Sequence, residues 1–164
     1  PRLLGQQSVP PGMRFEPADC ASFANQQMVP AGAKGNMVAT TAEGDGNRFI
    51  TIALETSEAA EVKAPQDNCR KVGFAGGGVR GLVEEVEAPQ IEGVQTLGTH
   101  RVLQTTVDGK PPRTGELYNY VAGFGTFLVI VTANPLVLPD KPVAEVDTQR
   151  ARDLLAAAVK AVQN

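Results

Sequence analysis

The sequence predicts an α+β fold: a central, mainly antiparallel sheet of about six strands, with an N-terminal short helix and a C-terminal helix packed on it. Short apolar runs separated by Gly- and Pro-rich turns indicate many strands with tight connections. Helical periodicity near the C-terminus adds a helix. The 164 residues fit one domain, so we predict a single domain over residues 1–164.

The N-terminal region is predicted to be an extended arm followed by a helix. Residues 1–16 form the arm, because Val9-Pro10-Pro11-Gly12 breaks both helix and strand. A short helix follows from Pro17 to Met28, with Pro17 at its first position. Strand-like runs then lie at residues 35–41, 47–55, 99–107, 116–122 and 126–132, and two further runs, residues 71–75 and 79–86, flank a glycine cluster.

Two of the later segments give the strongest local signals. The run from Phe127 to Val131 is apolar at every position, which is typical of a central strand covered on two sides. After Asp147, a good N-cap residue, apolar side chains recur at helical spacing. We therefore expect the C-terminal helix to lie across the sheet.

The charge of the chain argues against nucleic-acid binding. Its 15 basic and 18 acidic residues are scattered and give a net charge of -3 and a pI near 5.2, whereas a nucleic-acid footprint needs a basic stripe. No apolar run reaches the length of a spanning helix. Because the chain begins at Pro1, we expect a processed leader or a trimmed boundary upstream, where any lipid anchor would lie.

The residues 76–81, Gly-Gly-Gly-Val-Arg-Gly, match the spacing of a dinucleotide-binding loop. Such a loop needs a helix after it, but Pro89 ends the next segment early, and the valines of that segment fit a strand or a loop equally well. A glycine-rich turn or bulge is the favoured interpretation. We predict no cofactor.

Reactive side chains are few, and the sequence does not predict an enzyme. His100 is the only histidine, and no activated serine accompanies it, so a strand histidine is favoured over a catalytic base. Glu84, Glu85 and Glu87 form an acidic patch that could supply an acid and a base, although a solvated strand edge explains it more simply. Tyr118 and Tyr120 alternate on one strand face and could line a ligand surface or pack across strands. We predict no catalytic, cofactor-binding or metal-binding residues.

The two cysteines, Cys20 and Cys69, are far apart in sequence. A zinc site or redox dithiol lacks its partners, because there is no C-x-x-C and only one histidine. A structural disulfide is favoured, and two buried thiols are the alternative. A bridge closing about 50 residues would stabilise the fold by about 4 kcal/mol.

Several short motifs resemble mycobacterial envelope lipoproteins of unassigned function and, more distantly, the extracellular sensor domains of kinases such as PknH. The resemblance extends over nearly the whole chain and ends in an Ala/Leu/Val-rich helix. The other motifs that carry it are residues 9–12, Pro17-Ala18-Asp19-Cys20-Ala21, Asn68-Cys69, Ala88-Pro89-Gln90-Ile91, Tyr118-Asn119-Tyr120-Val121-Ala122 and Ala133-Asn134-Pro135.

The resemblance implies export across the plasma membrane, often with a lipid on an upstream cysteine. It also implies an antiparallel sheet flanked by helices and a disulfide between Cys20 and Cys69. The kinase sensor domains typically have two cysteine pairs, whereas this chain has one. The family supplies no catalytic residue.

We therefore expect a non-catalytic, monomeric domain on the outer side of the membrane.

Its expected partner is an envelope protein or a cell-wall component bound in a surface groove. The alternative is a carrier of lipid or another apolar ligand, which would need an internal cavity lined by aliphatic side chains and Phe. A membrane would be contacted only through the upstream anchor.

Overall fold

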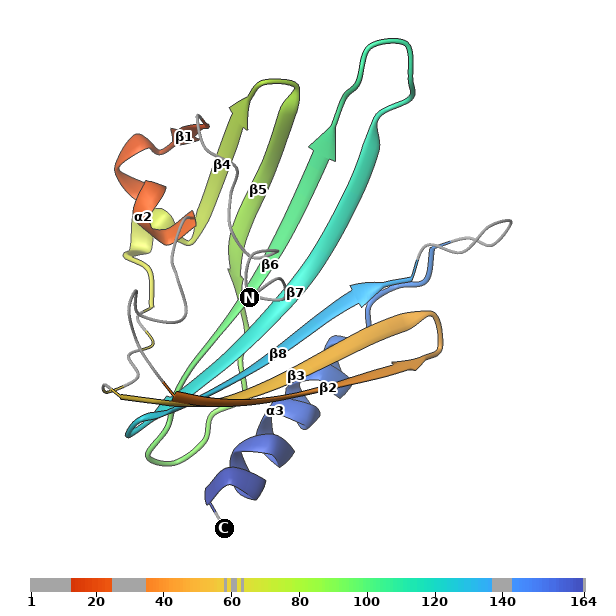
Figure 1. The fold of residues 1–164 in the computed structure, drawn as a ribbon. Coiled ribbons are helices and arrows are strands. Elements are labelled where there is room, and N and C mark those ends of the chain that lie inside the picture. Colours follow the sequence, from red (N-terminus) through yellow and green to blue (C-terminus); the bar gives the residue numbers. More distant parts are fainter. Residues whose placement is uncertain are drawn as a thin grey trace.

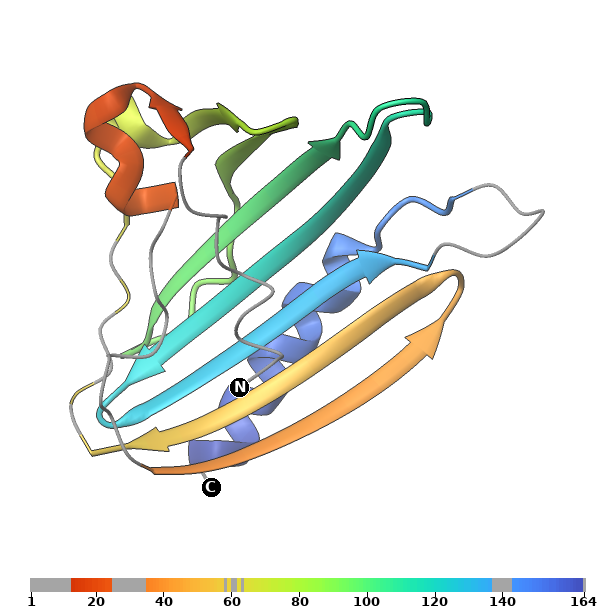
Figure 2. The ribbon, with the colours of Figure 1, turned by 45° about the horizontal axis from the view of Figure 1, so that its top comes forward.

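The computed structural model describes residues 13–24, 35–57, 59, 62, 64–136 and 143–163. Its eight strands form one sheet in the order β1-β4-β5-β6-β7-β8-β3-β2, and every neighbouring pair is antiparallel. The long C-terminal helix lies behind the sheet, and the short N-terminal helical turns lie in front of it (Figures 1 and 2).

The sheet is built mainly from successive hairpins. The strands are β1 (Arg14–Glu16), β2 (Gly35–Gly44), β3 (Asn47–Thr56), β4 (Lys71–Gly76), β5 (Val79–Val86), β6 (Gln95–Thr105), β7 (Arg113–Phe124) and β8 (Phe127–Pro135). The helical segments are η1 (Ala18–Cys20), α2 (Ala21–Ala24), η2 (Asp67–Cys69) and α3 (Thr148–Gln163).

Each face of the sheet carries its own apolar core. The face covered by η1 and α2 is called the inner face, and its core contains Cys20, Phe23, Val83 and Leu128. The opposite, outer face packs against α3 through Leu155. Since directly paired residues of antiparallel strands point to the same side, the strand register assigns every side chain to one of these faces.

The predicted central strand and C-terminal helix are confirmed. Strand β8 lies between β7 and β3, and residues 128–133 are buried whichever face they point to. Helix α3 starts after Asp147, whose Oδ1 accepts a hydrogen bond from the backbone N–H of Arg150 at 3.0 Å. Its buried residues Ala151, Leu155 and Val159 keep the helix on the outer face.

The predicted number of strands was wrong, because the sheet has eight strands rather than about six. Part of the predicted N-terminal arm is a strand: Arg14–Glu16 pairs with β4 and extends the sheet at that edge. A three-residue strand is too short to show an alternating pattern in the sequence. Its extended conformation depends instead on pairing with β4. The predicted helix starts near Pro17 as 3-10 helix Ala18–Cys20 and continues as α2, and residues 1–12 and 25–34 lie outside the described part.

The glycine-rich turns follow the predicted chemistry. Asp45 and Gly46, with φ of 52° and 78°, make the two-residue turn between β2 and β3. Gly77 and Gly78 do the same between β4 and β5, with φ of 53° and 79°. Both turns need left-handed backbone, which glycine adopts readily. The dinucleotide-like motif is therefore a hairpin turn, followed by a strand.

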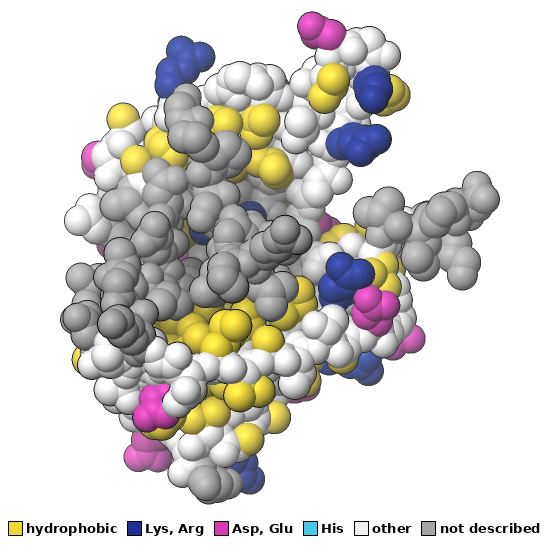
Figure 3. Space-filling model, viewed as in Figure 1, with side chains coloured by type: hydrophobic (Ala, Val, Ile, Leu, Met, Phe, Trp, Pro, Cys, Tyr) yellow, Lys and Arg dark blue, Asp and Glu magenta, His cyan; other side chains and the backbone are white. Residues whose placement is uncertain are grey.

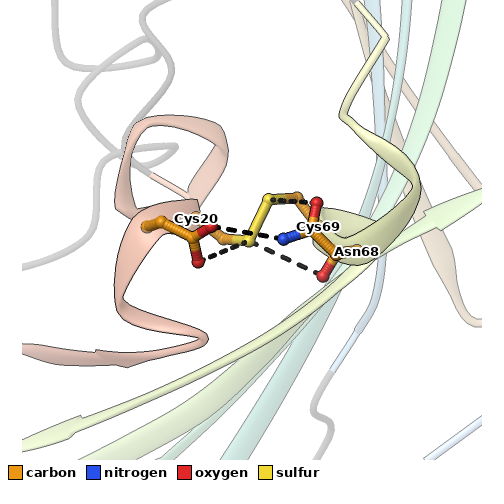
Figure 4. Close-up of a disulfide and its surroundings, with 4 residues drawn as sticks. Cys20, Asn68 and Cys69 are labelled. Carbon is orange, nitrogen blue, oxygen red and sulfur yellow. Dashed lines mark hydrogen bonds between the residues drawn. A yellow bond between two sulfur atoms is a disulfide. The ribbon is translucent and has the colours of Figure 1, made fainter.

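The expected disulfide joins the N-terminal turn to the segment before β4 (Figure 4). The Cα atoms of Cys20 and Cys69 are 5.3 Å apart, and both residues are buried in the inner core. Beside the bridge, Nδ2 of Asn68 donates a hydrogen bond to Oδ2 of Asp19 at 3.3 Å. The bridge therefore fastens η1 and α2 to the body of the sheet.

Replacing both cysteines by alanine is expected to destabilise the protein by about 4 kcal/mol, because the unfolded chain regains the freedom of a loop of about 50 residues. For a domain of this size the melting temperature should fall by about 10 °C, measured by circular dichroism. Adding a reductant should destabilise the wild type and leave the double variant unchanged. Equal melting of the two proteins without reductant would contradict a stabilising bridge.

Candidate functional site

A cluster of polar side chains on the outer face is centred on His100 of β6. Its Nδ1 lies 2.9 Å from Oε1 of Glu84 on β5, and its Nε2 lies 2.9 Å from Oε2 of Glu116 on β7. The register pairs His100 with Glu84 and with Tyr118, so the cluster spans three neighbouring strands. The imidazole side chain is 14% exposed.

The hydrogen bonds of His100 use both of its ring nitrogens. A neutral imidazole offers one donor and one acceptor, so both bonds to ionised carboxylates form together only when the ring carries two protons. The ring also stacks on Tyr118, with centroids 4.2 Å apart and planes 13° apart. His100 is thus held from three sides, which suits a cross-strand clamp better than a base open to substrate.

The acidic residues Glu84, Glu85 and Glu87, which are close together in sequence, do not form one patch in the structure. Glu84 points to the outer face and binds His100, whereas Glu85 points to the inner face, where its Oε1 lies 3.7 Å from Nε of Arg70. Glu87 is exposed beyond the end of β5. Sequence reasoning missed Glu116 as the second partner of His100, because the signal lies in the β6–β7 register.

The cluster does not have the arrangement of a metal centre. Its two carboxylates contact opposite nitrogens of the ring, so the donor atoms diverge from a common point. Within the described part of the chain, no group of three or more His, Cys, Asp or Glu residues is arranged to hold a metal ion.

Two tyrosines continue the outer face from His100 toward α3. Burial raises the pKa of Tyr118, and the negative charges of Glu116, Glu84 and Glu145 raise it further. Burial also raises the pKa of Tyr120, against the opposing effect of Arg152. The rings of the two tyrosines are 6.5 Å apart and nearly parallel, so the predicted alternation on one strand face is confirmed.

A groove opens on the outer face beyond the His100 cluster and has a volume of about 840 Å³. Two rows of paired residues cross β1, β4, β5 and β6 to form its floor. One row is Arg14, Ala75, Arg80 and Gln104, and the other is Glu16, Gly73, Leu82 and Val102.

Glycine and small side chains keep the floor of this groove low. Gly73 carries no side chain, and Ala75 beside it contributes only a methyl group. Gly81 lies in the row between, where any side chain would collide with the ring of Phe74 and the carbonyl of Val102. The Phe74 ring therefore packs flat on the strand at this point and supports the groove from the inner side.

The groove and the His100 cluster are adjacent in register. Val102 of the groove floor pairs with Glu116, whose carboxylate holds Nε2 of His100. At the far side of the floor lies Arg80, whose Nε donates to Oε1 of Gln104 at 2.8 Å. The outer face thus presents basic groups at one end of the groove and a carboxylate–imidazole cluster at the other.

Comparison with known protein families matches residues 1–163 to a domain of unknown function, DUF5642. The chain belongs to this DUF5642 family. The X-ray structure of an uncharacterized protein from Mycobacterium smegmatis, an Rv0999 ortholog, is similar to this DUF5642 domain with 60% sequence identity and a TM-score of 0.89. The match covers 96% of this chain and 80% of that one.

These comparisons agree with the mycobacterial resemblance seen in the sequence and add no activity to it. No functionally curated protein has significant similarity to this DUF5642 domain. Among the residues that the structure describes, no helix has the length and apolar character needed to cross a membrane. The disulfide is consistent with an exported domain.

Replacing His100 by Phe keeps a ring beside Tyr118 and removes both hydrogen bonds. We expect a loss of about 1–2 kcal/mol in the free energy of unfolding, measured by urea denaturation, because two charge-assisted bonds at partly exposed carboxylates disappear. Glu87→Gln is the matched control in the same acidic segment and should change stability by less than about 0.5 kcal/mol. A His100→Phe variant as stable as the wild type would show that the cluster does not clamp the strands.

The two tyrosines are the only ones in the chain, and there is no tryptophan, so absorbance at 295 nm follows their ionisation directly. Both should ionise above the ordinary tyrosine pKa of about 10 in the folded protein. Because the folded state holds these protons more tightly than the unfolded chain, stability should fall as the pH rises past about 10.

The contribution of Glu116 can be isolated in a Tyr120→Phe background, where Tyr118 alone titrates. Replacing Glu116 by Gln there should lower the pKa of Tyr118 toward its ordinary value, because a negative charge near the phenol is removed. An unchanged titration curve would mean that Glu116 does not act on the phenol.

Proposed function

We propose that this DUF5642 domain is a non-catalytic binding domain of the cell envelope and that the outer-face groove binds a partner protein or a cell-wall component. The observation that carries the proposal is the groove itself, an open depression of about 840 Å³ built on a regular four-stranded floor. This volume lies within the usual range of about 300–1,000 Å³ for ligand sites.

The chemistry of the groove supports a polar partner. Arg14 and Arg80 lie on one side of the floor, and Glu84 and Glu116 lie in the rows toward His100. A ligand that carries both charge signs along its length would be complementary to this arrangement. The apolar strip at Leu82 and Val102 would contact the less polar part of such a ligand.

A non-catalytic role fits the engagement of the reactive groups. Both cysteines are joined in the disulfide, which leaves no free thiol in the described part of the chain. Both ring nitrogens of His100 contact carboxylates. The proposal also includes export, an upstream lipid anchor, a monomeric state and distant kinship with the kinase sensor domains.

The groove favours the binding domain over the alternative, a carrier of an apolar ligand. A carrier encloses its ligand in an aliphatic cavity, whereas this groove is open and has two arginines on its floor. The two roles predict different ligands in mass spectra of the protein purified from its own envelope. A co-purified lipid held inside the domain would favour the carrier.

Filling the groove tests the proposal. Val102→Trp places a bulky ring on the floor and should reduce binding at least tenfold, because the ligand can no longer reach the floor. Val107→Trp is the matched control, since Val107 is exposed after the end of β6 and outside the groove.

Binding is measured in two ways, to separate the two classes of partner. Sedimentation with a protein-free cell-wall preparation detects a cell-wall component, and a photo-crosslinking residue at Gln104 detects an envelope protein. Loss of either signal in Val102→Trp, with retention in Val107→Trp, supports the groove. Full binding by Val102→Trp in both assays would refute it.

A further inference from the structure

Arg101, the neighbour of His100 on β6, points to the inner face and is buried without a charge partner. It is 9% exposed, and the register places it between Val83 and Leu117. Within the described residues it makes no ion pair or hydrogen bond, and its Nε is fully buried without an acceptor. Arginine is almost never buried unless it is paired, because a desolvated charge is costly.

The acidic residues of the described inner face do not supply this partner. The carboxylate of Glu85 lies one register row away on the same face and pairs instead with Arg70, at 3.7 Å between Oε1 and Nε. Burial lowers the pKa of the Arg101 guanidinium, and no carboxylate of the described residues opposes this effect.

A second unsatisfied donor lies beside Arg101. Thr99 is two residues earlier on the same strand face and 3% exposed, and its Oγ1 has no hydrogen-bond partner among the described residues. The register pairs Thr99 with Asn119, whose Oδ1 accepts a hydrogen bond of 2.7 Å from the hydroxyl of Thr132. A polar row therefore crosses β6, β7 and β8 within an apolar face.

The surroundings of this row are apolar on one side and open on the other. Leu97 and Val121 border it within the inner core. On the opposite side, Leu103 is 36% exposed, and a side chain added at its partner Gly115 would meet nothing within 4 Å. Figure 3 shows this face of the molecule, with hydrophobic side chains gathered at several places on it.

We infer that Arg101 and Thr99 form a binding site for an anionic group, a carboxylate or a phosphate. The guanidinium would donate two parallel hydrogen bonds to the oxyanion, and the Thr99 hydroxyl would donate a third. The bound anion supplies the charge that the described chain lacks at this point. The site lies on the opposite face from the groove and does not depend on the function proposed for it.

The anion is either a free oxyanion or the head of an acidic amphiphile whose chain lies along the apolar inner face. Three probes distinguish these sources: inorganic phosphate, dihexanoyl phosphatidic acid and dihexanoyl phosphatidylcholine. The Nε–H signal of Arg101 in ¹H–¹⁵N spectra reports binding directly, and thermal shifts give affinities. A response to phosphate and phosphatidic acid alike identifies an oxyanion site, whereas a response to phosphatidic acid alone shows that the chain is also bound.

The critical variant is Arg101→Met, which keeps the length of the side chain and removes the charge. Binding of the responding probe should weaken at least tenfold, while the variant without ligand should melt no lower than the wild type, because an unpaired buried charge has been removed. Thr99→Val should weaken binding several-fold, because one hydrogen bond to the anion is lost. This variant tests the site independently if Arg101→Met folds poorly. The matched control is Arg152→Met, which makes the same charge change on α3.

Two results would overturn the inference. One is that no anionic probe perturbs the Arg101 signal or the melting temperature. The other is that Arg101→Met binds the anionic probes as tightly as Arg152→Met does. Neither result would bear on the function proposed for the groove, because that test uses different variants and different ligands.

Discussion

The antiparallel register of β5, β6 and β7 is the constraint on which the chemistry of both faces depends. It pairs Glu84 with His100 and His100 with Tyr118, and it places Glu116 beside Val102 of the groove. The side-chain period of a strand is two, so a shift of one residue would exchange the inner and outer sets completely. The cluster and the groove therefore exist only while this register is kept.

Apolar burial, more than any polar contact, holds the register. Leu97, Val83 and Val121 enter the inner core from these three strands, and Tyr120 enters the outer core. Burying one such side chain contributes about 1.5–3 kcal/mol, whereas a partly exposed charged pair contributes about 0–1 kcal/mol. The disulfide does not join these three strands, because it fastens the N-terminal turn to the edge of the inner core.

Local chemistry in the sequence predicts the hairpins, the central strand and the C-terminal helix, because the residues that determine each element lie close together in the sequence. Glycine at Gly46 and Gly78 provides the left-handed turns, and Asp147 provides the helix cap. The short edge strand Arg14–Glu16 could not be found in this way, because three residues show no period and pairing with β4 decides their conformation.

The candidate site was only partly predictable, for a similar reason. Glu84, His100 and Tyr118 each attracted attention in the sequence, but neighbouring strands can pair in many registers, and only one brings these residues together. No sequence signal marks Glu116 as the partner of His100. None marks Arg101 as a charge without a partner among the described residues. Their roles follow from the face to which each residue points and from what lies opposite.

His100 and Arg101 are consecutive on one strand and show how the two faces differ. His100 meets two carboxylates on the outer face, whereas Arg101 meets none among the described residues of the inner face. Electrostatics alone would favour the opposite arrangement, with the permanent charge of the arginine between Glu84 and Glu116. The apolar pattern of β6 prevents this, because turning Arg101 outward would turn Leu97 outward as well. The native register therefore retains a buried charge at a cost of several kcal/mol. A bound anion is the kind of group that would offset this cost, and local departures of this kind tend to occur where proteins bind ligands.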